Sequence, residues 1–391
     1  MKEVVILSAL RTPIGGLNGS LSSLTAPALG SVAIREALAQ ARVGAESVDA
    51  VIMGNVISAG VGQAPARQAA LKAGLPNTVG CTTINKVCGS GLAAVAIAAQ
   101  MIRAGEAEAI VAGGMESMSN APYLLDRARG GYRMGHAALF DSLLKDGLWD
   151  AAGDFHMGAA AEKCAERFSI SRAEQDEFAA TSYRRAHSAE TRGDFKGEIV
   201  PVVTGQKNGA AAVVEDEAVK RFDAEKMRAL KPAFKADGTV TAGNSSSISD
   251  GAAAVVLTSR ERAVALGLKP LARIVGAAAS AREPEWFTIA PADVIPKLLD
   301  QCRYTLSDVD LFEINEAFAA ASIAVNRLLR LDPEKVNVRG GAVALGHPIG
   351  ASGARILTTL THALVDLDKE RGVAALCIGG GEAVAMMLER I

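Results

Sequence analysis

The fold is decided by a stretch that occurs twice, first as Ser47-Val48-Asp49-Ala50-Val51-Ile52 and again, about 260 residues later, as Asp308-Val309-Asp310-Leu311-Phe312-Glu313. Each copy contains apolar residues typical of a strand and follows a segment with a helical pattern, 31–42 in the first case and 292–303 in the second. Similarity at a fixed offset is typical of a chain that contains a duplicated unit.

The match between the two regions continues downstream. Ser90-Gly91 precedes a predicted apolar helix at 91–103, and Ser352-Gly353 precedes a predicted helix at 353–366. A strand that ends in glycines follows each helix, at 109–114 and at 373–381. Because these elements recur in the same order, we predict an α/β protein with two similar halves.

The segment between the halves, 119–249, has a different character. It is rich in charged residues, shows helical patterns at 157–168 and 171–191, and lacks a long apolar strand, whereas the core pattern resumes at Ala252–Thr258. We therefore predict an N-terminal half made of 1–118 with 250–268, an inserted loop domain at 119–249 and a C-terminal half at 269–391.

The composition agrees with this fold class. Of the 391 residues, 49% are apolar but only 4% are aromatic. An interior filled by Ala, Val, Ile and Leu is typical of a tightly packed α/β protein. Because 41 Lys and Arg are balanced by 43 Asp and Glu, no broad basic surface is available and we expect no nucleic-acid partner.

Sequence features also bear on compartment and cofactors. The longest apolar stretch, Leu92–Ile102, is interrupted by Gln100 and is shorter than the roughly 20 residues that cross a bilayer. Residues 1–7 resemble the start of a strand and not a signal peptide. We expect a cytoplasmic protein without membrane contact. The five cysteines show no CxxC spacing and the five histidines no HxxxH pair, so neither disulfides nor a metal site are expected.

Cys88 is the first candidate for chemistry. It stands in the turn Ile84-Asn85-Lys86-Val87-Cys88-Gly89-Ser90-Gly91, directly ahead of the apolar helix. The N-terminus of a helix favours a thiolate, and the glycines on either side of Ser90 let a substrate approach the backbone. A small buried core cysteine is the alternative, but a strand-to-helix turn is a better place for a nucleophile.

His347 is the second candidate. It lies in the segment 337–350, where Gly346 and Pro348 fix the backbone on either side. A structural or surface role is the alternative for a single histidine. The repeat places His347 near the position that corresponds to the Cys88 turn, so the two side chains could meet between the halves. A Cys and His pair is the minimum for an activated sulfur nucleophile.

Two more candidates follow strands. Cys377 ends the apolar strand 373–378 and precedes Gly379-Gly380-Gly381, which exposes backbone N–H groups and leaves room for a ligand. Asn315 follows the predicted strand 311–314. Two roles are open for this residue: it could cap the next helix, or it could take part in catalysis. The chain has neither a complete GxGxxG fingerprint nor a GxxxxGK[ST] loop, which disfavours NAD and ATP.

Taken together, these segments resemble the thiolase family over essentially the whole chain. The resemblance implies the two duplicated α/β halves, with the inserted domain holding coenzyme A, and it is greatest to members that condense two acetyl-CoA molecules. The matching segments are Arg11-Thr12-Pro13-Ile14-Gly15, the Cys88 turn, 113–123 (GGMESMSNAPY), 239–244, 315–319 (NEAFA), Gly346-His347-Pro348 and Cys377 with its glycines.

The resemblance implies a role for each candidate. Cys88 matches the nucleophile that accepts the acyl group, His347 the base that makes it a thiolate, and Cys377 the acid/base that moves the proton of the second acetyl-CoA. Asn315, through a bound water, and His347 would stabilise the enolate, while N–H groups of Cys88 and Gly379 would stabilise the tetrahedral intermediate.

The implied reaction is a reversible Claisen condensation of two acetyl-CoA to acetoacetyl-CoA and CoA through an S-acetyl-cysteine. It needs no permanently bound cofactor, and the family resemblance favours a homotetramer built from dimers. The positions that match coenzyme contacts are Leu148, His156, Met157, Phe234, Ser246, Ala317 and Phe318. Core packing is an equally good local interpretation of Met157. A set of residues this apolar is suited to bind the pantetheine arm of coenzyme A. The charged loop domain would then bind the nucleotide end of the coenzyme.

Three departures concern the coenzyme and the glycine-rich end. Val219 stands where many members have an Arg near the adenine, although Lys220 and Arg221 follow and could replace it. Ser247 replaces a Gly, and Glu382-Ala383 replaces an uncharged residue followed by Gly.

A fourth departure concerns substrate choice. Phe287 stands where the family has an acyl-pocket Met, and some members with Phe accept 2-methyl-branched 3-ketoacyl-CoA. A degradative thiolase acting on longer or branched substrates is therefore the alternative function, against which the pair His156-Met157 argues. A decarboxylating condensing enzyme would not need Cys377 as a base, and a non-catalytic acyl-CoA carrier would need no nucleophile.

Overall fold

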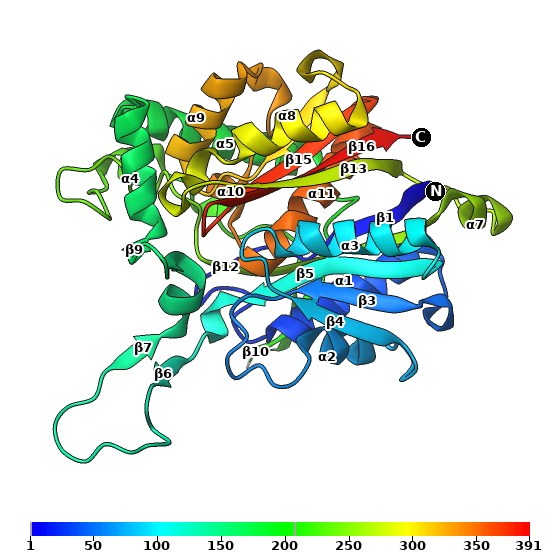
Figure 1. The fold of residues 1–391 in the computed structure, drawn as a ribbon, viewed down its shortest axis with the longest axis horizontal. Helices are drawn as coiled ribbons and strands as arrows, with labels where there is room; N and C mark the ends of the chain where they lie inside the picture. The colour runs from blue at the N-terminus through cyan, green and yellow to red at the C-terminus, as the bar shows by residue number, and fades with distance from the viewer. Residues whose placement is uncertain (1, 207–208) are drawn as a thin grey trace.

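One ten-stranded sheet runs through both halves of the chain in the computed structural model, which describes residues 2–206 and 209–391. Its strand order is β14-β15-β16-β13-β1-β12-β5-β3-β4, with β2 paired to β12 (Figure 1). The strands are β1 (Val4–Arg11), β2 (Gly15–Gly16), β3 (Ala50–Gly54), β4 (Gly80–Ile84), β5 (Ala109–Ser117), β12 (Ser249–Ser259), β13 (Ala272–Ala281), β14 (Leu311–Ile314), β15 (Arg371–Ile378) and β16 (Glu382–Arg390).

The sheet is mixed, and a short junction joins its halves. Strand β3 is parallel to β4 and β5, and β14 is parallel to β15, while the remaining neighbours are antiparallel. At the junction β1 pairs with β13 only at Val5 with Arg273 and Ile6 with Ala272. The chain can therefore fold the two halves of the sheet around a shared helical layer.

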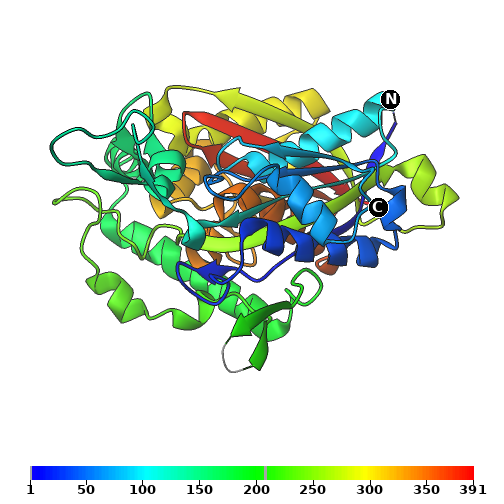
Figure 2. The same cartoon turned by 90° about the horizontal axis from the view of Figure 1, so that it is seen from below.

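Helices cover both faces of each half (Figures 1 and 2). Helices α1 (Ala26–Ala41) and α2 (Pro65–Lys72) pack outside the first half, and α8 (Pro291–Cys302) packs outside the second. Helices α3 (Ser90–Ala104) and α11 (Ile349–Asp366) contact each other and strands of both halves. The layers thus alternate helix, sheet, helix, sheet, helix, with α3 and α11 in the middle.

Strand β5 shows why the core strands are apolar without alternation. Ile110 faces the cluster that contains α3 and α11, and its neighbour Val111 faces the cluster that contains α1 and α2. Both faces of the strand are buried, as expected for a sheet covered by helices on both sides. The clusters consist mainly of Ala, Val, Ile and Leu, which confirms the inference from composition.

The duplication predicted from the repeated stretch is confirmed in its hydrogen bonds. The Asp49 carboxylate accepts N–H bonds from Glu108 (2.6 Å) and Ala109 (2.9 Å). In the second half the Asp310 carboxylate accepts N–H bonds from Glu370 (3.0 Å) and Arg371 (2.9 Å). In both halves an aspartate ahead of one strand therefore fixes the start of the neighbouring strand.

The matched glycines of the repeat bring the two central helices together. A Cβ atom on Gly91 would lie 2.7 Å from the backbone nitrogen of Ala354, and one on Gly353 would lie 2.3 Å from that of Leu92. No real side chain fits at such distances, so each glycine lets its helix touch the backbone of the other. The predicted end of the first strand was wrong, because β5 continues through its glycines to Ser117. Strand β15 ends at Ile378, as the apolar run 373–378 predicts, and the glycines that follow form a turn and are not part of the strand.

The inserted segment contains helices and short hairpins, and its predicted boundaries stay a prediction. Helices α4 (Met157–Arg167) and α5 (Arg172–Arg192) agree with the predicted helical patterns. The remaining elements are β6 (Tyr123–Leu125), β7 (Leu139–Asp141), β8 (Trp149–Asp150), β9 (Phe155–His156), β10 (Val202–Gln206), β11 (Gly209–Val213) and α6 (Ala224–Ala229). Figure 1 shows the β6–β7 hairpin extending away from the body of the molecule.

One apolar helical window is longer than the stretch Leu92–Ile102 noted in the sequence. By length and composition alone, Val87–Ala104 is apolar enough to cross a membrane, with a mean hydropathy of 1.5 over 18 residues. Half of this window is buried. Most of it forms α3, which packs against α11 and β5 as the core helix of a globular protein does.

Candidate active site

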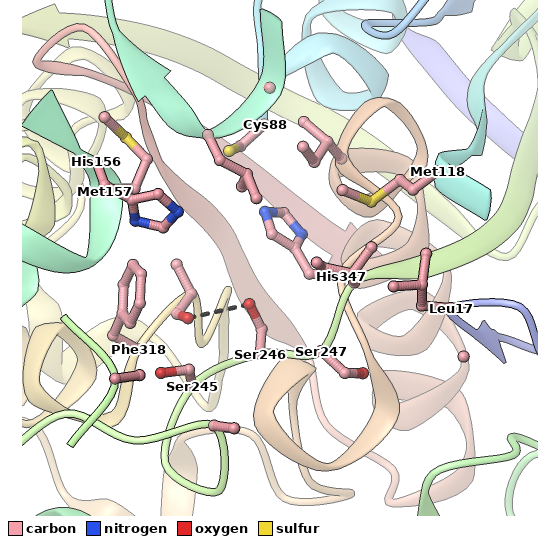
Figure 3. Close-up of a pocket in the computed structure, with 18 of the residues that line it drawn as sticks. Leu17, Cys88, Met118, His156, Met157, Ser245, Ser246, Ser247, Phe318 and His347 are labelled. Atoms are coloured by element: carbon pink, nitrogen blue, oxygen red, sulfur yellow. Dashed lines mark hydrogen bonds between the residues drawn. The ribbon is translucent and has the colours of Figure 1, made fainter. Parts of the chain in front are cut away.

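The turn that carries Cys88 is rigid. The Ser90 hydroxyl donates to the Val87 carbonyl (2.7 Å) and accepts from the Lys86 N–H (2.8 Å). Gly89 is the N-cap of α3, and Val87 has a φ of 46°. A left-handed conformation is strained for a β-branched residue and occurs most often at functional sites. The turn therefore holds Cys88 in one orientation, at the wall of a large pocket (Figure 3).

Cys88 is half-buried at the pocket wall, and this burial favours its neutral form. Removal from water raises the pKa of its thiol to about 11, and hydrogen bonds from the backbone N–H groups of Gly379 and of Cys88 itself offset this only in part. The resting Cys88 is therefore a neutral thiol in spite of its place at a helix N-terminus. A thiol in this state needs a base at the moment it reacts.

His347 lies at the same pocket, so the structure brings together the two residues that the repeat predicted to meet. Its backbone N–H donates to the Ser247 carbonyl (3.1 Å), and its Nδ1 lies 2.6 Å from the Ser352 hydroxyl. Its Nε2 is buried without a hydrogen-bond partner in the described chain. Burial, followed by the nearby Arg355, lowers the His347 pKa to about 3. The imidazole is neutral at pH 7 and can accept a proton.

Cys377 lies behind the pocket wall. It is buried and packs with Met157, Phe287, Ala317 and Phe318. Burial, and next the neighbouring Cys88, raise the pKa of its thiol. Cys377 is therefore a neutral thiol close to Cys88 in the resting protein.

Asn315 is not a helix cap. The N-cap of helix α9 (Ala319–Leu329) is Phe318, so that alternative was wrong. The Asn315 side chain is buried, and neither its oxygen nor its nitrogen has a hydrogen-bond partner in the described part of the chain. A buried amide with unused donors and acceptor is suited to hold a water molecule or a substrate oxygen.

Gly379 contributes its backbone to the pocket beside Cys88. The next two residues, Gly380 and Gly381, have φ angles of 90° and 92°. A Cβ atom on Gly381 would lie 2.2 Å from the Arg282 carbonyl oxygen. The glycine run therefore makes a tight turn at the end of β15, which directs the Gly379 N–H at the Cys88 sulfur.

The pocket has a volume of about 570 Å³. The structure brings all the predicted substrate and coenzyme positions to its wall: Leu148, His156, Met157, Phe234, Ser246, Phe287, Ala317 and Phe318. Met157 both lines the pocket and packs in the core, so its two interpretations are compatible. Contact with coenzyme A itself stays a prediction.

Aromatic rings make one wall of the pocket stiff. His156 caps α4 by accepting the Gly158 N–H on Nδ1 at 2.9 Å. Its ring stacks on Phe234 with centroids 4.8 Å apart, and Phe234 meets Phe318 edge to face at 6.2 Å. Burial lowers the His156 pKa. This wall is apolar and is held by contacts between its own rings, which suits an apolar ligand.

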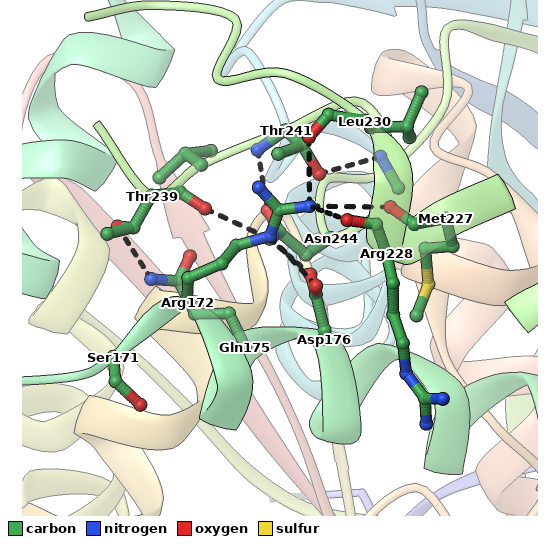
Figure 4. A network of polar contacts seen from close by, with 12 residues as sticks. Ser171, Arg172, Gln175, Asp176, Met227, Arg228, Leu230, Thr239, Thr241 and Asn244 are labelled. Atoms are coloured by element: carbon green, nitrogen blue, oxygen red, sulfur yellow. Dashed lines mark hydrogen bonds and ion pairs between the residues drawn. The ribbon is translucent and has the colours of Figure 1, made fainter. Parts of the chain in front are cut away.

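A serine loop continues the wall beside Phe318, to which Ser245 is bridged, and the loop is held in place by the polar network of Figure 4. Both the N–H and the hydroxyl of Ser246 donate to the Ala317 carbonyl at 3.0 Å. The Asn244 side chain donates to Asp176 (2.9 Å), which also pairs with Arg172 (2.8 Å) on α5. Because the Ser247 carbonyl accepts the His347 N–H, the network also supports the histidine.

At the polar part of the pocket the structure distinguishes the two basic residues next to Val219. Val219 is buried in an apolar cluster. Arg221 lines the pocket and pairs with Glu217, whereas Lys220 pairs with Glu215 and does not line the pocket. Lining residues that sequence reasoning missed include Leu17, Met118, Leu144, Gly147, Tyr183 and Ala233. These residues lie on loops and helices that are brought to the pocket only by tertiary packing.

Comparison with known proteins settles the family. The model described as "Thiolase, N-terminal domain" matches residues 4–261, and "Thiolase, C-terminal domain" matches residues 268–390. The chain belongs to the thiolase family. This confirms the resemblance inferred from the motifs.

Individual thiolases are similar over their full length. Acetyl-CoA acetyltransferase 2 of Arabidopsis thaliana is 55% identical over 391 residues, which cover 99% of this chain and 97% of the relative. An acetyl-CoA acetyltransferase of Escherichia coli K12 is 52% identical with full coverage of both chains. The crystal structure of the Bacillus anthracis acetyl-CoA acetyltransferase superposes with a TM-score of 0.98 at 43% identity, covering 100% of this chain and 99% of that one.

Proposed function

We propose that this thiolase is an acetyl-CoA C-acetyltransferase that condenses two acetyl-CoA to acetoacetyl-CoA and CoA, reversibly and through an S-acetyl-cysteine. One observation carries the proposal: a neutral Cys88 thiol, with the Gly379 N–H on its sulfur, shares a pocket with a neutral His347 whose Nε2 is free. Full-length relatives named acetyl-CoA acetyltransferase support it.

In the first half-reaction the Cys88 sulfur attacks the thioester carbon of acetyl-CoA while its proton moves to Nε2 of His347. The N–H groups that hydrogen-bond the sulfur lie where the thioester oxygen becomes negatively charged. The carbon–sulfur bond to coenzyme A then breaks, and the leaving sulfur takes a proton from Cys377. This leaves S-acetyl-Cys88, an imidazolium and a Cys377 thiolate.

In the second half-reaction the Cys377 thiolate removes a proton from the methyl group of another acetyl-CoA. The enolate oxygen is stabilised by the N–H at Nε2 of His347 and by a water held on Asn315. The enolate carbon attacks the acetyl group, the bond to Cys88 breaks, and the Cys88 sulfur recovers its proton from His347. Acetoacetyl-CoA is released and both thiols are neutral again.

Coenzyme A binding follows the division of the pocket. The apolar wall formed by Leu148, Phe234 and Phe318 takes the pantetheine arm, and Arg221 provides positive charge for the phosphates. We also propose that the enzyme holds no permanent cofactor, is cytoplasmic and is a homotetramer. Among residues 2–206 and 209–391 no group of three or more His, Cys, Asp or Glu is placed to hold a metal ion.

The test is acetylation of the protein with acetyl-CoA, followed by intact mass measurement and peptide mapping. One acetyl group on Cys88 is expected, and Cys88→Ser should abolish the adduct and turnover. Cys377→Ala should still be acetylated, because the coenzyme A sulfur can leave as a thiolate without a proton from Cys377. It should condense about 10²- to 10⁴-fold more slowly, because no base then removes the methyl proton of the second acetyl-CoA. An acetyl group on Cys164 or Cys377 would contradict the assignment, as would equal loss of both half-reactions in Cys377→Ala.

Cleavage of longer or 2-methyl-branched 3-ketoacyl-CoA is the second candidate function, and Phe287 favours the branched form. Its ring is 2% exposed and packs with Met157 and Cys377 at the reacting end of the pocket. Phe287→Met exchanges a rigid ring for a flexible thioether. We expect it to lower the ratio of kcat/KM for 2-methylacetoacetyl-CoA over acetoacetyl-CoA by roughly tenfold or more. An unchanged ratio in an active variant would remove Phe287 from substrate selection.

A further inference from the structure

The catalytic histidine is held by a residue to which the proposed mechanism gives no role. The Ser352 hydroxyl lies 2.6 Å from Nδ1 of His347 and donates to the Pro348 carbonyl at 2.9 Å. Ser352 is fully buried in the first turn of α11. No carboxylate hydrogen-bonds the imidazole in the part of the chain that the structure describes.

The hydrogen bonds of this serine fix the tautomer of the imidazole. A hydroxyl has one proton to donate. Since that proton is directed at the Pro348 carbonyl, the Ser352 oxygen must accept at 2.6 Å, and Nδ1 of His347 must carry the hydrogen. Nε2 then presents a lone pair.

The opposite tautomer would place two acceptors against each other, because the lone pair of Nδ1 would face a lone pair of the Ser352 oxygen at 2.6 Å. Its N–H at Nε2 would be buried with no acceptor from the described residues. Leaving a buried N–H unpaired is costly. The Nδ1–H tautomer instead lets Nε2 accept the proton of Cys88.

The repeat supports a positioning role for this serine. Ser90, its counterpart in the first half, donates to the Val87 carbonyl and fixes the Cys88 turn at the start of α3. Ser352 donates to the Pro348 carbonyl and holds the His347 turn at the start of α11. The Gly350 N–H also donates to the Glu116 carboxylate at 2.8 Å, which anchors this turn to β5.

We propose that Ser352 is a positioning residue that holds His347 in the tautomer protonated at Nδ1, so that Nε2 accepts the proton of Cys88 during acyl transfer. The Ser352 oxygen keeps the same hydrogen bond when the imidazole becomes an imidazolium, so nothing reorganises in this step. The inference deepens the proposed function and rests on it for the acyl-transfer step alone.

The first measurement is the tautomer of His347 in the full-length resting protein. The chain has five histidines, so nitrogen-15 NMR of labelled wild type and His347→Asn identifies the two ring nitrogens. We expect a protonated Nδ1 in the wild type and a mixture of tautomers in Ser352→Ala. A wild-type imidazole protonated at Nε2 would overturn the proposal.

The second measurement separates the positioning role from a structural one. Ser352→Ala should slow acetylation of Cys88 by roughly 10- to 100-fold with the KM for acetyl-CoA within about twofold of wild type. Thr358→Val is the matched control, because the buried Thr358 hydroxyl makes the same kind of bond six residues further along α11, to the Ala354 carbonyl at 2.9 Å. The Thr358→Val variant should change neither the rate of Cys88 acetylation nor the KM for acetyl-CoA.

The outcomes distinguish this inference from the proposed function. Unchanged acetylation in Ser352→Ala would overturn the positioning role while the proposed function stands. If the wild type is not acetylated at all, the proposed function fails. Two measurements that need no coenzyme then decide the inference: the tautomer of His347 and the rate at which iodoacetamide alkylates Cys88. The alkylation rate should fall in Ser352→Ala but not in Thr358→Val.

Discussion

At the scale of single residues, the site keeps its reacting groups uncharged. Cys88 and His347 share a pocket in which burial disfavours both the thiolate and the imidazolium. In the proposed mechanism, charge therefore develops on His347 and on the thioester only when the Cys88 sulfur attacks the bound substrate. A site of this kind protects the thiol from reagents that need a preformed thiolate.

This charge state makes a prediction about pH. The pKa of Cys88 is raised to about 11, so the thiolate population is negligible at neutral pH and grows only as the pH rises toward that value. The thiolate absorbance at 240 nm, taken as wild type minus Cys88→Ser, should correspond to less than about a tenth of a thiolate at pH 9.5. An ordinary cysteine would be mostly ionised there. A thiolate signal at pH 7 would contradict the neutral resting state.

At the scale of elements, the site depends on the contact between α3 and α11. Each helix begins at a turn that carries one of the proposed catalytic residues, Cys88 for α3 and His347 for α11. The paired glycines, Gly91 and Gly353, set the distance between the helices. The relative position of the proposed nucleophile and its base therefore depends on how closely the two helices pack.

Gly353→Ala tests this dependence. Its Cβ atom would lie 2.3 Å from the Leu92 backbone nitrogen, so the helices must separate. We expect a loss of about 1–3 kcal/mol in the free energy of unfolding, measured in urea, together with slower Cys88 acetylation. Gly205→Ala is the control, since a Cβ atom there meets nothing within 4 Å. Equal unfolding curves for the two variants would contradict the close contact.

How far the sequence could predict the site follows from the same elements. The repeat placed Asp49 and Asp310 in equivalent roles and brought Cys88 and His347 together, because duplicated segments share a local geometry. The position of Arg221 at the pocket wall and the bond between Ser352 and His347 could not be predicted. They depend on how a loop and a helix turn are oriented by packing, for which the sequence carries no local signal.

At the scale of the whole molecule, one feature does not serve the pocket. The β6–β7 hairpin extends from the body (Figure 1) and exposes apolar side chains along its length. Met134 at its tip is 99% exposed, and the cross-strand partners Leu125 and Leu139 are 45% and 64% exposed. An apolar surface of this kind on an extended hairpin is suited to contact other copies of the chain.

The proposed homotetramer can be tested on this hairpin. Light scattering of the wild type should give roughly 160 kDa, four times the 40.3 kDa of one chain. Leu125→Asp combined with Leu139→Asp places two charges on adjacent positions of the hairpin, and their burial between subunits would cost several kcal/mol. We expect this variant to shift to about 80 kDa, since a tetramer built from dimers loses its weaker contact first.

Val264→Asp is the control, because Val264 is 71% exposed on α7 (Arg260–Ala265), outside the hairpin. A hairpin variant that remains at the wild-type mass would show that these side chains do not join subunits, and a wild type of 40 or 80 kDa would exclude the tetramer itself.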